Sequence, residues 1–139
     1  MRLALITALT LGSVGAASAQ GLSTADQVRP ILQMTAAQWI GVREWDGQDL
    51  VYFTHLLPFR CGLESIRYAI NDATELSLFP AEPCPPEQDG ATFATIDAEA
   101  YLPYLTFPLG SVETVAVSIT YDDGGVQTQV YERAAVAIP

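Results

Sequence analysis

The chain has 139 residues, with sixteen acidic side chains, six Arg and no Lys. Arg2 lies in an N-terminal segment that resembles an export signal, so residues 20–139 carry a net charge of 5 − 16 = −11. A surface of this sign repels nucleic-acid phosphates and anionic lipid headgroups, so we expect neither nucleic-acid binding nor peripheral membrane binding. The absence of Lys also excludes Schiff-base chemistry on a lysine side chain.

Residues 1–19 have the pattern of a cleavable secretory signal peptide. Arg2 supplies a positive charge, an uncharged apolar stretch follows over residues 3–15, and Ala17-Ser18-Ala19 offers the small residues of a cleavage site. The stretch is too short to span a bilayer, which takes about 20 residues. We therefore expect a periplasmic or secreted protein, with one domain over residues 20–139 and no stable membrane insertion after cleavage.

The remaining sequence predicts one helix near its start. Ser23-Thr24 can cap a helix, Asp26 follows in the first turn, and Val28, Ile31, Leu32 and Ala36 recur at helical spacing. We predict a short helix over about residues 24–37, in which Pro30 is tolerated only if the helix begins close to it.

From Trp39 onward the apolar residues alternate with polar ones, which predicts strands. Asp46-Gly47, Asn71-Asp72 and Asp122-Asp123-Gly124-Gly125 are turn signals between strands. Pro108 ends an expected edge strand, and the Pro-rich segment 80–90 is expected to be a loop. The predicted strands cover residues 39–45, 49–57, 63–70, 74–79, 92–96, 104–107, 113–121 and 126–133, and residues 97–101 are expected to form a helical turn or an edge.

The two cysteines, Cys61 and Cys84, are predicted to form a disulfide, because an exported protein with two cysteines usually pairs them. The chain-entropy model gives such a bridge about 3 kcal/mol of stabilisation. The same oxidising compartment argues against a thiolate that binds metal or attacks a substrate.

These elements predict an all-β fold, an immunoglobulin-like antiparallel β-sandwich whose short N-terminal helix packs on a sheet or caps its end. Several runs carry a resemblance that covers nearly the whole of residues 20–139, among them Trp45-Asp46-Gly47, Arg60-Cys61-Gly62-Leu63, Ile66-Arg67-Tyr68-Ala69-Ile70-Asn71, Pro108-Leu109-Gly110-Ser111 and Tyr121-Asp122-Asp123-Gly124. On these runs the chain resembles small uncharacterised exported proteins of alphaproteobacteria, a likeness that implies a compartment and no chemistry. The end of the strand near Tyr68 and the final hairpin are also similar in kind to immunoglobulin-like and fibronectin type III-like domains.

Trp39, Arg43 and Trp45 are the candidate binding residues, because alternate residues of an extended strand share one face. An exposed strip of this kind stacks on sugar rings or anchors a protein partner, with Arg43 on Trp45. The alternative is that both Trp close the core while Arg43 extends to solvent. We favour the alternative, because a domain this small needs its large aromatics inside.

No catalytic, metal or cofactor site is predicted. His55 is the only histidine, on an expected strand face with Val51, Phe53 and Leu57, and the sequence contains no G-x-S-x-G elbow and no second imidazole for zinc. We interpret it as a structural residue. Asp122 and Asp123 are a less favoured Ca²⁺ alternative, because their turn departs from the EF-hand pattern and Asp-Gly is what a hairpin turn requires.

The leading hypothesis is a non-catalytic exported module that recognises a protein or glycan at the cell envelope. Two alternatives stay open: a small periplasmic enzyme or enzyme inhibitor built on acidic residues and His55, and a structural envelope protein. The exposure of Trp39 and Trp45, and a cleft that gathers His55 with carboxylates, distinguish these hypotheses. The oligomeric state is left open.

Overall fold

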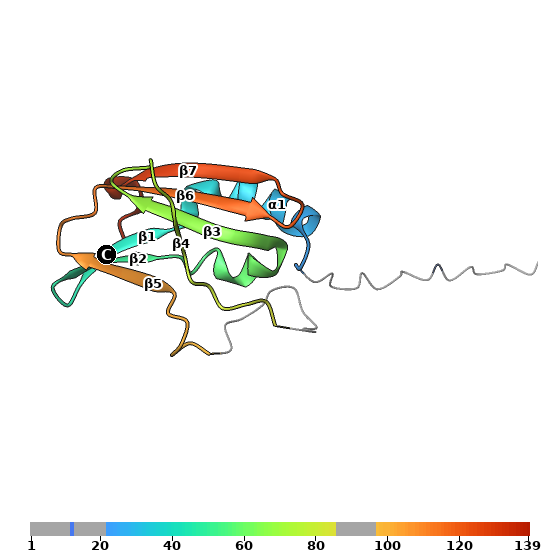
Figure 1. The fold of residues 1–139 in the computed structure, drawn as a ribbon, viewed down its shortest axis with the longest axis horizontal. Helices are drawn as coiled ribbons and strands as arrows, with labels where there is room; N and C mark the ends of the chain where they lie inside the picture. Colours follow the sequence, from blue (N-terminus) through green and yellow to red (C-terminus); the bar gives the residue numbers. More distant parts are fainter. Residues whose placement is uncertain (1–11, 13–21, 86–96) are drawn as a thin grey trace, which may run out of the picture.

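The computed structural model describes residues 12, 22–85 and 97–139. Most of the predicted signal peptide and the predicted strand 92–96 lie outside the described residues. Within them the chain forms two antiparallel sheets and few helices, which confirms the predicted all-β class (Figure 1). One sheet has the order β1-β2-β5 and the other β4-β3-β6-β7. The strands are β1 Gly41–Trp45, β2 Gln48–Tyr52, β3 Leu63–Ile70, β4 Ser77–Leu78, β5 Tyr104–Pro108, β6 Thr114–Tyr121 and β7 Val126–Glu132.

Four helical segments complete the described chain: α1 Ala25–Met34, the 3₁₀ helices η1 Ala36–Gln38 and η2 Leu57–Gly62, and the short C-terminal α2 Arg133–Val136. In this part of the protein no helix combines the length and apolar character needed to cross a membrane. The two sheets lie as separate layers in Figure 1, with β3, β6 and β7 above β1, β2 and β5.

Helix α1 closes one end of the two layers. Thr24 and Gln27 form a reciprocal capping box at its start. The helix begins five residues before Pro30, so this proline lies inside it and not near its first turn. The helix tolerates Pro30 because the fully buried Val28 and Leu32 hold it against the core. Arg29 forms an ion pair with Asp123 in the β6–β7 turn.

The β1–β2 hairpin turns at Asp46-Gly47, as predicted. Asp46 has φ 51° and Gly47 has φ 71°, which are the left-handed values that a tight two-residue hairpin needs and that Asp-Gly adopts readily. Strand β2 ends at Tyr52, however, and the predicted strand 49–57 is therefore too long. Phe53 accepts a backbone hydrogen bond from Leu56, so the chain turns and continues into η2.

The predicted strand 74–79 is also too long, since β4 covers only Ser77–Leu78. Phe79 adds one more hydrogen bond, from its N–H to the carbonyl of Ile66, and then Pro80 has no N–H with which to extend the pairing. The final hairpin and β5 at the edge of its sheet are confirmed. The disulfide Cys61–Cys84 is also present, with its Cα atoms 5.0 Å apart.

The core lies between the two sheets and continues under α1. Phe53 is its aromatic centre, with ring centroids 4.2 Å from Phe79 and 5.7 Å from Tyr68. Its largest fully buried members include Trp39, Tyr121, Phe53, Leu32, Leu56 and Ile119. Because this core fills the space between the layers, the outer face of each sheet is left for other contacts.

Candidate functional site

The structure separates the predicted strip of Trp39, Arg43 and Trp45. Trp39 precedes β1 and is fully buried, and its indole N–H donates to the carbonyl of Leu32 at 2.9 Å. Trp45 is 58% exposed at the end of β1, and the Arg43 guanidinium lies 4.4 Å from its ring centroid. The expectation that both Trp close the core is therefore wrong for Trp45. The expectation that Trp39 shares the strand face is wrong too, because β1 begins only at Gly41.

The register of the three-stranded sheet places two tyrosines on the face of Arg43 and Trp45. Residues directly opposite each other in antiparallel strands point to the same side. Gly41 is opposite Tyr52, which is in turn opposite Tyr104, and the rings of these tyrosines are 5.3 Å apart. The outer face thus comprises Gly41, Arg43, Trp45, Gln48, Leu50, Tyr52, Tyr104, Thr106 and Pro108. We call this set the aromatic face.

Sequence reasoning missed Tyr52 and Tyr104. Tyr52 has the opposite parity to Val51 and Phe53, which was a usable signal that it leaves the core face. Tyr104 had no such signal, because its pairing with Tyr52 joins segments that are far apart in the sequence.

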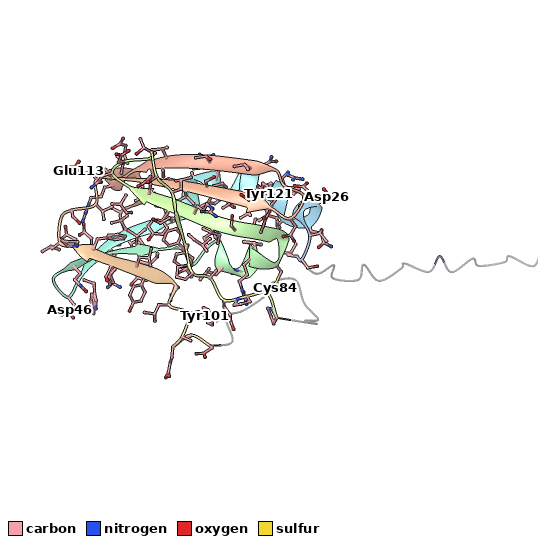
Figure 2. The ribbon with its side chains drawn as sticks, in the orientation of Figure 1. Asp26, Asp46, Cys84, Tyr101, Glu113 and Tyr121 are labelled. Atoms are coloured by element: carbon pink, nitrogen blue, oxygen red, sulfur yellow. A yellow bond between two sulfur atoms is a disulfide. The ribbon has the colours of Figure 1, made fainter. Side chains whose placement is uncertain are left out.

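Figure 2 shows the β1–β2 hairpin with Asp46 at its tip, at the opposite end of the molecule from Asp26 of α1.

A hollow of about 300 Å³ lies at one end of the aromatic face, lined by Gly41, Arg43, Tyr52, Thr54 and Ile138. Gly41 makes room for its wall, because a Cβ on this residue would lie only 2.2 Å from Cδ1 of Ile138. The C-terminal segment is held there by a hydrogen bond from the Ile138 N–H to the carbonyl of Val42. The hollow is therefore lined by a cationic residue, Arg43, by the aromatic ring of Tyr52 and by the hydroxyl-bearing Thr54.

The acids of these strands point away from the aromatic face. Glu44 and Asp49 are opposite each other on the inner side of the sheet, where both bind Arg133. Asp49 is fully buried and accepts hydrogen bonds from the Arg133 guanidinium and from the Val112 N–H. These contacts hold the pKa of Asp49 far below its usual value. The Asp49–Arg133 pair joins the two sheets. Neither acid of these strands lies on the outer face.

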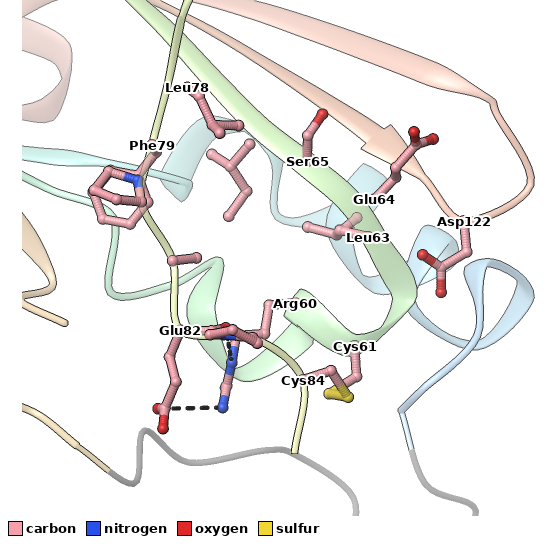
Figure 3. A pocket seen from close by; sticks show the side chains of 14 residues that line it. Arg60, Cys61, Leu63, Glu64, Ser65, Leu78, Phe79, Glu82, Cys84 and Asp122 are labelled. Atoms are coloured by element: carbon pink, nitrogen blue, oxygen red, sulfur yellow. Dashed lines mark hydrogen bonds and ion pairs between the residues drawn. A yellow bond between two sulfur atoms is a disulfide. The ribbon is translucent and has the colours of Figure 1, made fainter. Parts of the chain in front are cut away.

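A second cavity, of about 430 Å³, lies between β3 and the segment that carries Cys84 (Figure 3). The polar contacts that line this cavity hold the fold together. The buried Arg60 donates to the carbonyls of Leu57 and Glu82 and lies 3.5 Å from the Glu82 carboxylate. These contacts and the neighbouring disulfide fasten the segment to η2. Glu64 and Asp122 stand at the other end of this cavity in Figure 3.

Asp122 and Asp123 differ in their surroundings. Asp123 accepts hydrogen bonds from Arg29 and from the Gly125 N–H, which lower its pKa. Burial raises the pKa of Asp122, with smaller contributions from the charges of Glu64 and Asp123. Among the described residues, no group of three or more His, Cys, Asp or Glu side chains is placed to hold a metal ion.

His55 lies in the turn after β2, and the predicted strand position is wrong because β2 ends at Tyr52. Its Nε2 is 2.9 Å from Oγ1 of Thr35, its ring is 5.8 Å from that of Phe59, and burial lowers its pKa. In residues 22–85 and 97–139 no carboxylate forms an ion pair with it. The arrangement orients the imidazole and gives it no acid–base partner there.

Comparisons with known proteins found no matching family model, no significant match among the curated proteins and none among the solved structures. The aromatic face is therefore the candidate site on its geometry alone.

Proposed function

We propose that this protein is an exported, non-catalytic recognition module that binds a saccharide of the cell envelope on its aromatic face. The observation that carries the proposal is the alignment of Trp45, Tyr52 and Tyr104 on the outer side of the β1-β2-β5 sheet. The apolar side of a sugar ring packs on aromatic rings, and the Tyr, Thr and Gln groups around them bond to sugar hydroxyls. The signal-like residues 1–19 and the resemblance to exported alphaproteobacterial proteins support a periplasmic or secreted location.

We further propose that the fold is an immunoglobulin-like sandwich of the fibronectin type III kind. If the strands are lettered A, B, C, C′, E, F and G in chain order, the two sheets read A-B-E and C′-C-F-G. This order supports the proposal, because it keeps the G-F-C sheet of such domains with C′ at its edge.

The proposal is tested by screening the purified domain, residues 20–139, against an array of bacterial envelope glycans, followed by titration calorimetry on each hit. Trp45→Ala and Tyr104→Ala should each weaken binding at least about tenfold, as truncation of an aromatic anchor does. Val130→Ala is the matched control, since Val130 is 64% exposed on the other sheet and Trp45 is 58% exposed. A blank array, or equal losses in all three variants, contradicts the proposal.

A further inference from the structure

We infer that the saccharide bound by the aromatic face is acidic and that Arg43 holds its carboxylate, an inference that rests on the proposed function. Arg43 differs from most arginines of the described chain. Arg29, Arg60 and Arg133 each form an ion pair with an acidic side chain. Within residues 22–85 and 97–139, no such pair involves Arg43 or Arg67. In a domain with a large excess of acids, this leaves Arg43 available to an external anion.

The position of Arg43 is defined before any ligand arrives. Its guanidinium lies over the Trp45 ring, so part of the conformational freedom of a long side chain is already lost. Stacking engages the face of the planar group and leaves N–H donors on its rim. Two of these donors match the two oxygens of a carboxylate in a bidentate geometry.

The electrostatics of the face favour an anion despite the negative net charge. None of the nine residues of the aromatic face is acidic, and Glu44 and Asp49 lie on the opposite side of the sheet, where both pair with Arg133. At physiological salt the Debye length is about 8 Å, so exposed acids farther than this from the face are largely screened from it. Arg43 therefore provides the local charge that a ligand meets.

The hollow beside Arg43 supplies the second part of the site. Its volume of about 300 Å³ is at the lower end of the range of about 300–1,000 Å³ for small-molecule sites. It therefore suits a single sugar unit better than a bulky group. Tyr52 and Ile138 offer an apolar wall and Thr54 a hydroxyl. A uronic or sialic acid residue fits this chemistry, with its ring in the hollow and its carboxylate on Arg43.

The test uses two acidic probes, tetragalacturonate and sialyllactose, with methyl-esterified tetragalacturonate and lactose as their neutral partners. Titration calorimetry on the domain should show at least one acidic probe binding about tenfold or more tightly than its partner. Arg43→Gln should abolish this difference, while Arg67→Gln, which removes an exposed arginine that forms no ion pair within the described residues, should preserve it. The difference should also shrink as salt concentration rises.

The possible failures separate the two proposals. If each acidic probe and its neutral partner bind equally, or if only neutral glycans from the array bind, the inference about Arg43 is wrong and the saccharide proposal stands. If a tetraglutamate peptide binds as tightly as the acidic sugars, the site recognises charge alone, and the inferred ligand class is wrong. If neither the probes nor any array glycan binds, both proposals fail.

Discussion

Arg133 Nη1 lies 2.6 Å from Asp49 Oδ2, and Arg133 Nη2 lies 3.0 Å from Asp49 Oδ1, so one guanidinium binds both oxygens of a fully buried carboxylate. Asp49 belongs to β2 and Arg133 follows β7, so the pair connects the two sheets. Val112 completes the cluster: its N–H donates to Asp49 and its carbonyl accepts from Arg133. This cluster stabilises the sheet that carries the aromatic face.

Arg133→Met should lower the free energy of unfolding by about 3 kcal/mol, because it leaves the Asp49 carboxylate buried without its cation. The double variant Arg133→Met/Asp49→Asn should recover part of this loss, since no buried charge remains. Arg29→Met removes a more exposed pair with Asp123 and should cost less than about 1 kcal/mol. Urea denaturation measures the free energy of unfolding of all three variants. Similar losses in Arg133→Met and Arg29→Met would contradict the greater structural weight given to the Asp49–Arg133 pair.

Stability should fall in acid because of Asp49. The pKa of Asp49 is lowered in the fold, so the unfolded chain takes up the proton first as the pH decreases. The stabilisation is complete above the unfolded-state pKa of about 3.9 and is lost as the pH falls below it. Asp49→Asn should flatten the dependence of unfolding free energy on pH between about 5 and 2, and an unchanged slope would refute this role.

Asp122 should have the opposite effect on how stability depends on pH. Its pKa is raised by burial and by Glu64 and Asp123, so its contribution to stability is present below the unfolded-state pKa and is lost as the pH rises through the folded-state value. Asp122→Asn removes the partly buried charge and its repulsion from Glu64 and Asp123, so it should increase the melting temperature at pH 7, with little change in strong acid. A lower melting temperature at pH 7 would show that the carboxylate has a favourable partner.

Removal of the disulfide should destabilise the domain by about 3 kcal/mol, because Cys61 and Cys84 are 23 positions apart in the sequence and the bridge restricts the unfolded chain. Cys61→Ala/Cys84→Ala and reduction by dithiothreitol should lower the urea midpoint to similar extents. The double variant should not respond to the reductant. A variant midpoint equal to that of the wild type would contradict the prediction.

The close approach of Gly41 and Ile138 predicts a coupled pair. Gly41→Ala places a Cβ 2.2 Å from Cδ1 of Ile138, so the Ile138 side chain must shift, at a cost of about 1 kcal/mol. Ile138→Ala removes the obstructing atoms, and Gly41→Ala should then cost little in the Ile138→Ala background. A double-mutant cycle by thermal denaturation measures this coupling, and additive losses would show that the two residues do not interact.

The helix cap, the Asp46-Gly47 turn, the last hairpin and the Cys61–Cys84 bridge could be predicted because each depends on a few residues close in sequence or on cysteine pairing. The conformation of the segment after Tyr52 could not be predicted in this way. Its residues Phe53, Leu56 and Leu57 are all buried, and a continuous apolar run fits a strand or a turn into a short helix equally well. The structure selects the turn, because Phe53 bonds to Pro103 and Leu56 within the folded core.

The sequence by itself determined the all-β class, the negative net charge, the disulfide and the alternation that puts Arg43 and Trp45 on one face. Only the tertiary structure decided that Trp39 enters the core, that Trp45 remains exposed, and that Tyr52 and Tyr104 lie on the same sheet face as Arg43 and Trp45. Alternation along one strand is a local property of the backbone. Which side faces the core, and which distant strand pairs with it, depends on packing among segments far apart in the chain.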